Sequence, residues 1–250
     1  MDSIERNAAA IALNGKDQPT TDFVILVTGL TGVGKSTFIN SLLKEPSLDL
    51  PVGHKQDPCT KELREVEIEN HKGRRVYIVD TPGFNSTDAY DLDILKKIAA
   101  WLKNRSPEQP IDGGVIYLHN IQDDHYSTLT DTDLSILRNS FGQLQETLGR
   151  IVLATTKWHR SNIDESRRRQ LELQEKHWKA LLAGGTSVME FRNDHDSAKE
   201  IVETLLKNSD KPLSFDIKTK LDELMQIQTD TSSHSVLKFL RFFGLFSRYS

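Results

Sequence analysis

The chain has 250 residues and a formal net charge of −4, which suits one compact domain with appendages. Basic and acidic residues number 32 and 36, and this near balance argues against nucleic-acid binding through bulk charge. The single cysteine, Cys59, cannot form an internal disulfide, and no apolar run is long enough to span a bilayer. The N-terminus lacks the pattern of a signal peptide. We therefore expect a cytoplasmic protein, with peripheral membrane attachment as the alternative.

Residues 1–21 are polar and Ala-rich without a strong period, which predicts a flexible arm. Between residues 22 and 208, β-branched apolar runs alternate with stretches of helical apolar spacing. Strands are expected near 23–28, 62–69, 75–80, 113–119, 150–155 and 186–191. Helices are expected near 35–44, 89–104, 130–147, 164–183 and 194–208. The alternation predicts a doubly wound, mostly parallel six-stranded α/β sheet, with the charged segment 62–69 as an antiparallel edge strand.

Residues 29–37 read G-L-T-G-V-G-K-S-T, which has the G-x-x-x-x-G-K-S spacing of a P-loop. A strand before it and a helix after it would aim backbone N–H groups and the helix dipole at one phosphate group. Lys35 is expected at the β- and γ-phosphates, and Ser36 Oγ is expected on Mg²⁺. The alternative is a Gly-rich turn with a lone lysine. The residues predicted to bind nucleotide here are Gly29, Thr31, Gly32, Val33, Gly34, Lys35, Ser36 and Thr37.

A second motif, D-T-P-G, begins at Asp80 and directly follows the strand at 75–80. The Asp80 carboxylate would hold a Mg²⁺-bound water, and the Gly83 N–H would approach the γ-phosphate. The alternative is a plain turn. Thr60 lies in the loop before the edge strand, where its hydroxyl would bind Mg²⁺ and its N–H would sense the γ-phosphate. The predicted metal ligands are thus Ser36, Thr60 and Asp80, and the predicted catalytic residues are Lys35, Thr60 and Gly83.

In this order, the P-loop, the loop threonine and D-T-P-G resemble the septin-like P-loop GTPases. The resemblance is closest to the immunity-associated nucleotide-binding proteins of GIMAP type and their fungal AIG-type relatives, and it covers roughly residues 23–207. It implies a G domain, GTP or GDP with Mg²⁺, and a homodimer across the nucleotide face that supplies an arginine after the fourth strand. Asn120 stands at that position here. The weaker alternatives for the missing group are His54, His119 and Arg138.

Residues 156–159 read T-K-W-H after the strand at 150–155. GTPases carry [N/T]-K-x-D here, and the aspartate accepts two N–H bonds from guanine. His159 replaces it and offers at most one acceptor. Asn193 or Asp194, in the loop after the last strand, would replace the lost contact, and guanine remains the favoured base. The predicted residues on this side of the site are Thr156, Lys157 and Asn193.

Two basic segments lie outside these motifs. Arg167-Arg168-Arg169, in the helix expected at 164–183, is interpreted as part of a solvated face balanced by glutamates. After the G domain, residues 209–228 have the spacing of an amphipathic helix, and residues 229–250 form a linker and a basic-aromatic segment. Lys238 and Arg241 lie among phenylalanines and leucines there, which predicts a peripheral membrane contact through residues 234–250. The alternatives are packing on the domain itself and a dimer contact.

These observations predict a GTP-binding protein that hydrolyses GTP slowly, with stimulation by a dimer or partner, and acts as a nucleotide-dependent switch. Many GTPases place a water-orienting glutamine after D-x-x-G, but Phe84 occupies that position. The alternative is therefore a non-hydrolysing, GTP-bound scaffold for oligomer or membrane assembly. A P-loop kinase is a weaker interpretation, because D-T-P-G and T-K-x-x have no role in phosphate transfer to a second substrate.

Overall fold

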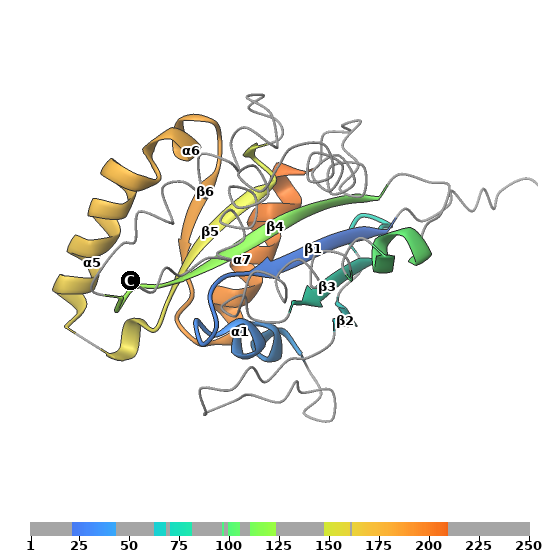
Figure 1. The fold of residues 1–250 in the computed structure, drawn as a ribbon, viewed down its shortest axis with the longest axis horizontal. Coiled ribbons are helices and arrows are strands. Elements are labelled where there is room, and N and C mark those ends of the chain that lie inside the picture. Colours follow the sequence, from blue (N-terminus) through green and yellow to red (C-terminus); the bar gives the residue numbers. More distant parts are fainter. Residues whose placement is uncertain are drawn as a thin grey trace, which may run out of the picture.

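The structure is a computed structural model that describes residues 22–43, 63–68, 71–81, 97, 100–105, 111–123, 148–160 and 162–209. In these residues, six strands form one sheet in the order β2-β3-β1-β4-β5-β6, with helices packed on it (Figure 1). The predicted six-stranded, mostly parallel α/β sheet is therefore confirmed. The predicted arm at 1–21, the helix at 130–147 and all features predicted for 210–250 lie outside the described residues.

The strands are β1 Phe23–Thr28, β2 Arg64–Glu67, β3 Val76–Asp80, β4 Asp112–Asn120, β5 Ile151–Thr156 and β6 Ser187–Glu190. β2 pairs antiparallel with β3, while all other neighbours run parallel. β1, β3 and β5 are buried along their whole length, as is typical of parallel strands covered on both faces. β2 is largely exposed at the end of the sheet. The prediction of an antiparallel edge strand is therefore confirmed.

The helices labelled in Figure 1 are α1 Lys35–Leu42, α5 Ile163–Glu172, α6 Lys179–Ala183 and α7 His195–Asn208. The 3-10 turn η2 Trp158–Arg160 precedes α5, and the π-helical turn η3 Leu173–His177 follows it. Phe38 of α1 and Leu205 of α7 belong to the same buried cluster as Ile25 and Ile116 of the sheet. Phe191 packs edge-on against Phe38, with ring centroids 5.2 Å apart. Among the described residues, no helix is long and apolar enough to cross a membrane.

The helix predicted over 164–183 is interrupted in the structure. The backbone N–H of Trp178 donates to Leu173 O at 2.7 Å, a hydrogen bond that spans five residues instead of four. This π turn separates α5 from α6. Trp178 follows it, and its side chain is fully buried. The break therefore lets one helical segment present a large aromatic residue to the interior.

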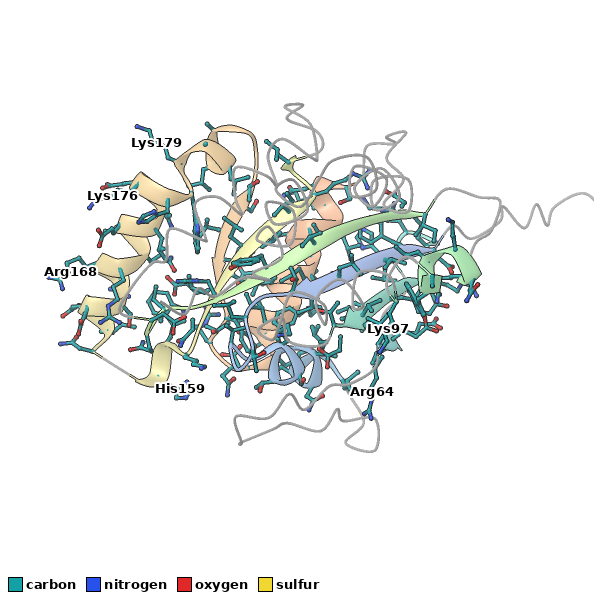
Figure 2. The ribbon with its side chains drawn as sticks, in the orientation of Figure 1. Arg64, Lys97, His159, Arg168, Lys176 and Lys179 are labelled. Atoms are coloured by element: carbon teal, nitrogen blue, oxygen red, sulfur yellow. The ribbon has the colours of Figure 1, made fainter. Side chains whose placement is uncertain are left out.

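Charged side chains project from the outward side of α5, η3 and α6. Arg168, Lys176 and Lys179 project away from the sheet there (Figure 2). Lys176 forms an ion pair of 2.7 Å with Glu172 on the same helical stretch. Arg169 likewise pairs with Glu165 at 2.8 Å, and its Nη1 also donates to Ile121 O at 3.3 Å. The predicted solvated face thus includes Arg168, whereas Arg169 reaches back to the end of β4.

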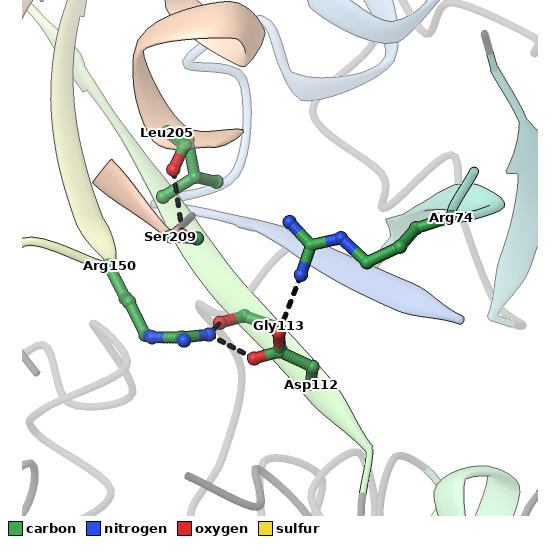
Figure 3. A network of polar contacts seen from close by, with 6 residues as sticks. All are labelled: Arg74, Asp112, Gly113, Arg150, Leu205 and Ser209. Atoms are coloured by element: carbon green, nitrogen blue, oxygen red, sulfur yellow. Dashed lines mark hydrogen bonds and ion pairs between the residues drawn. The ribbon is translucent and has the colours of Figure 1, made fainter. Parts of the chain in front are cut away.

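A buried arginine fixes the amino-terminal ends of the central strands (Figure 3). Arg150 has no exposed surface, and its guanidinium bonds the Asp112 carboxylate and, at 3.2 Å, Gly113 O. Arg74 donates to the same carboxylate at 2.7 Å. A Cβ on Gly114 would lie 2.8 Å from both Arg150 O and Leu205 Cδ1, so only glycine fits beside this arginine. A shared carboxylate offsets the large desolvation penalty of burying Arg150.

His119 is buried on the opposite face of β4 from Leu118. Its ring lies edge-on to Trp178, with centroids 5.7 Å apart. Burial lowers the pKa of His119 to about 4, and His177 nearby adds to the effect. The imidazole is therefore neutral at pH 7 in the folded protein.

This depressed pKa predicts a stability that falls in mild acid. The unfolded chain takes up a proton on His119 near pH 6.5, while the folded chain does so only near pH 4, so unfolding is favoured progressively between these values. The expected loss from this residue is about 3 kcal/mol between pH 7 and pH 4. Denaturant unfolding of wild type and His119→Phe at several pH values gives the free energy of unfolding. The contribution of His119 is the difference between the two proteins in the slope of this free energy against pH.

The matched control is His159→Gln, because His159 is exposed. It should keep the wild-type slope. If His119→Phe has the same slope as wild type, the pKa of His119 does not differ between the folded and unfolded states.

Candidate nucleotide-binding site

The loop between β1 and α1 is built from glycines in conformations that other residues rarely adopt. Gly29, Gly32 and Gly34 have φ values of 137°, 79° and 105°. A Cβ on Gly29 would lie 2.4 Å from Leu118 O, whereas one on Gly32 or Gly34 would meet nothing within 4 Å. Gly29 therefore allows the loop to approach β4, and the other two line open space. This arrangement fits a phosphate group, which needs backbone N–H groups and room.

The amino-terminus of α1 also favours an anion. Gly34 is its N-cap residue, and within the described part of the chain no side chain caps the helix and no acidic residue occupies its first turn. The first N–H groups of a helix lack partners within the helix and carry a partial positive charge. The local sequence thus leaves this end of the dipole for a ligand.

Lys35 lies across the loop. Its Nζ donates to Gly29 O at 2.9 Å and to Leu30 O at 3.1 Å, and only 7% of the residue is exposed. Burial lowers the pKa of Lys35 to about 8, and the negative charge of Asp80 partly opposes this. A phosphate group at the loop would restore the charged form of the ammonium.

Two of the predicted metal ligands are brought together. Ser36 Oγ donates to Asp80 Oδ2 at 3.1 Å, although 44 residues separate them. Asp80 is buried at the carboxyl end of β3, and the next residue, Thr81, anchors this end by donating to Val27 O at 2.9 Å. A hydroxyl and a carboxylate are oxygen ligands of the kind that Mg²⁺ prefers, so this pair fits the ion. The third predicted ligand, Thr60, lies outside the described residues, as do Gly83 and Phe84.

Thr156 connects the end of β5 to the P-loop. Its Oγ1 bonds Val33 O at 2.8 Å and His119 O at 3.3 Å, and the residue is buried. The Thr156 hydroxyl therefore links β5 to the P-loop and to β4, and it fixes the start of the segment that carries Lys157. Lys157 itself has a φ of 63°, which is unusual for a residue other than glycine.

The two residues after Lys157 diverge in role. Trp158 is buried, and its Nε1 donates to Thr155 Oγ1 at 3.0 Å and to Thr155 O at 3.2 Å, so it fills the core. His159 is exposed in η2 (Figure 2). The structure thus leaves His159 at the surface next to Lys157, without the carboxylate that guanine recognition uses.

The loop after β6 contains two candidates for a contact to the nucleotide base, and one of them is engaged in capping a helix. Asp194 Oδ1 accepts a bond of 2.8 Å from Ser197 N and caps α7, and this bond lowers the pKa of the Asp194 carboxyl. Asp194 is thus the N-cap of α7. Asn193 is exposed with a φ of 69°. Asn193 is therefore the better candidate for a base contact.

His119 does not suit the role of a substitute for the missing arginine. It is buried against Trp178 and neutral at pH 7, so it presents no positive charge to a second molecule. Asn120, at the end of β4, bonds its own loop by donating to Asp123 Oδ1 at 2.6 Å. The other two candidates, His54 and Arg138, lie outside the described residues.

Gln122 is a residue of this region that no motif indicates. Its Nε2 donates to Lys157 O at 3.3 Å and to Ser166 Oγ at 3.2 Å. It thus joins the loop after β4 to the loop after β5 and to α5. Only the three-dimensional arrangement brings these three segments together.

Comparison with known proteins relates this arrangement to characterised relatives. The family described as 50S ribosome-binding GTPase matches residues 24–157, more than half of the chain. Over 96 residues the chain is 36% identical to translocase of chloroplast 90 from Arabidopsis thaliana, covering 36% of this chain and 12% of that protein. Over 71 residues it is 39% identical to the small ribosomal subunit biogenesis GTPase RsgA of Staphylococcus epidermidis, covering 27% and 23%. The matches thus span less than a quarter of each relative.

Solved structures share the fold. Toc33 from Arabidopsis thaliana, in complex with Mg²⁺ and GMPPNP, has a TM-score of 0.53 at 19% identity, covering 76% of this chain and 87% of that chain. A variant of Era from Aquifex aeolicus bound to GDP and AlF4⁻ has a TM-score of 0.52 at 16% identity, covering 78% and 58%. A third structure has a TM-score of 0.57 at 18% identity, covering 78% and 86%. Its description states that dimerization is important for the GTPase activity of the chloroplast translocon components atToc33 and psToc159.

The P-loop, the Ser36–Asp80 pair and the loop after β5 occupy one edge of the sheet, where the carboxyl ends of the parallel strands meet. This edge fits a nucleotide with Mg²⁺. Taken with the family match over residues 24–157, it shows that the chain belongs to the 50S ribosome-binding GTPase family of P-loop proteins.

Proposed function

We propose that this GTPase domain is a nucleotide-dependent switch whose GTP hydrolysis is slow alone and is stimulated by a second copy or another partner. The observation that carries the proposal is the contrast between two parts of the site. Lys35, Ser36 and Asp80 are assembled for phosphate and metal binding. After β4, where the related dimeric GTPases are expected to supply an arginine, Asn120 is bonded into its own loop. The site thus favours binding over rapid turnover.

The residues divide the work by position. Lys35 and the P-loop amides bind the β- and γ-phosphates, Ser36 and Asp80 hold Mg²⁺ with Thr60 as the further ligand, and Gly83 senses the γ-phosphate. Mg²⁺ supplies positive charge that neutralises the phosphate oxygens. Lys157 and Asn193 contact the base.

A homodimer across the nucleotide face is the proposed source of stimulation. The structural neighbour for which dimerization is described as important for GTPase activity supports this arrangement. A kinship with the septin-like, GIMAP-type GTPases is part of the same proposal, and the order of the P-loop, Thr60 and D-T-P-G supports it. A non-hydrolysing scaffold is the competing outcome.

The first test of this proposal concerns Lys35. Replacing Lys35 with alanine should weaken nucleotide binding at least about tenfold, because a charge-assisted contact worth on the order of 1.5–3 kcal/mol or more is lost. Isothermal titration calorimetry with GTP and Mg²⁺ measures the effect. Lys179→Ala is the matched control, since Lys179 is exposed on α6 and projects away from the sheet (Figure 2). Near-normal affinity in a folded Lys35→Ala protein would refute the phosphate assignment.

The second prediction separates the switch from the scaffold. Under single-turnover conditions with saturating protein, the rate of GTP hydrolysis should rise with protein concentration, because a dimer completes the site. Lys35→Ala provides the background rate. A rate above background that is independent of concentration would contradict stimulation by a second copy, and the absence of hydrolysis at every concentration would favour the scaffold.

The third prediction concerns the base. His159→Asp should raise the ratio of GTP affinity to ATP affinity, because a carboxylate accepts two N–H bonds from guanine and repels the acceptor N1 of adenine. Competition binding with both nucleotides measures the ratio. Asn162→Asp is the control, since it adds a carboxylate nearby at the N-cap of α5, where aspartate caps as well as asparagine. If both variants keep the wild-type ratio, residue 159 does not contact the base.

A further inference from the structure

The three described residues after β4, 121–123, form a turn held by hydrogen bonds from Asn120. Asn120 Oδ1 accepts a bond of 3.1 Å from Gln122 N, and Asp123 N donates to Asn120 O at 3.2 Å. Asn120 Nδ2 closes the turn on Asp123 Oδ1. The backbone of Gln122 is therefore held in place, and its side chain extends from a defined point.

The side-chain amide of Gln122 is directed at the loop after β5. Its Nε2 lies 3.3 Å from Lys157 O and 3.2 Å from Ser166 Oγ. A carbonyl oxygen only accepts hydrogen bonds, so the amide nitrogen has to face Lys157. Ser166 is fully buried in α5 and provides a rigid second contact.

Lys157 has a backbone conformation that needs such support. Its φ of 63° lies in the left-handed region, which residues other than glycine seldom occupy. The preceding peptide is held by a bond of 3.2 Å from Ile121 N to Thr156 O, and the following carbonyl is held by Gln122. Both contacts come from the loop after β4. The direction of the Lys157 side chain follows from this backbone.

We infer that Gln122 is a positioning residue for the purine of the bound nucleotide, and that it acts by holding Lys157 in its left-handed conformation. The inference rests on the proposed role of Lys157 at the base. Gln122 holds Lys157 and does not read the base, because its amide nitrogen is engaged by Lys157 and Ser166. It sets how well the Lys157 stem covers any purine, so its loss weakens purine nucleotides alike and leaves phosphate binding intact.

The test compares probes with and without a base. Gln122→Glu keeps the size of the side chain but removes the donor to Lys157 O, and Gln122→Met removes both polar atoms. Each variant should bind GDP about fivefold to tenfold more weakly than wild type, the effect of losing one supporting hydrogen bond. Affinity for tripolyphosphate should stay within twofold, and the ratio of GDP affinity to IDP affinity should be unchanged. Calorimetry with Mg²⁺ measures all three.

Arg169→Met is the matched control, because Arg169 of α5 also bonds the residues after β4, at Ile121 O. It should retain GDP affinity within twofold. A purely structural role of Gln122 would lower the melting temperature and weaken GDP and tripolyphosphate equally, which would overturn the inference. A changed GDP to IDP ratio would also overturn it, since it would mean direct base reading. If wild type binds neither GDP nor tripolyphosphate, the proposed function fails instead.

Discussion

One buried hydrogen bond joins the two halves of the nucleotide site. Thr156 Oγ1 lies 2.8 Å from Val33 O, and the two residues are 123 positions apart in the chain. Val33 belongs to the P-loop, and Thr156 precedes Lys157, the lysine proposed to contact the base. Because an unmade buried hydrogen bond is expensive, the loops after β1 and β5 keep one relative position. The phosphate side and the base side of the site are thus built as one unit.

The two ends of the sheet treat buried charge in opposite ways. At the amino ends of the strands, Arg150 shares the Asp112 carboxylate with Arg74, so the charges satisfy one another within the protein. At the carboxyl ends, Lys35 is nearly as buried but bonds neutral carbonyls, and its pKa is lowered to about 8. The first arrangement stabilises a fold, whereas the second stores an unfavourable burial that an anionic ligand relieves.

Sequence reasoning succeeded where the physical signal is local. The six strands follow from apolar runs, the antiparallel edge follows from the charged alternation in β2, and the P-loop residues follow from glycine spacing. The P-loop and D-T-P-G motifs predict Ser36 and Asp80 as ligands of one metal ion, and the structure brings the two side chains within hydrogen-bond distance. The positions of Thr60 and Gly83 remain predictions.

The features that the sequence did not predict depend on tertiary contacts. Apolar spacing over residues 164–183 continues through the π turn, so it could not reveal that Trp178 is turned inward or that His119 is buried beneath it. Asp194 was considered for the base, yet its capping of α7 becomes clear only when the helix start is known. Gln122 belongs to no motif, and its importance arises from the meeting of three segments.

The lowered pKa of Lys35 has a consequence for the energetics of ligand exchange. Because burial lowers the pKa of Lys35 to about 8, part of the ammonium population is deprotonated near neutral pH before an anion binds. Loading with an anionic nucleotide restores that proton, so each binding event draws a fraction of a proton from the medium. Release of the nucleotide returns it. The heat of binding is therefore expected to contain the ionisation heat of the buffer, and the apparent affinity is expected to depend on pH.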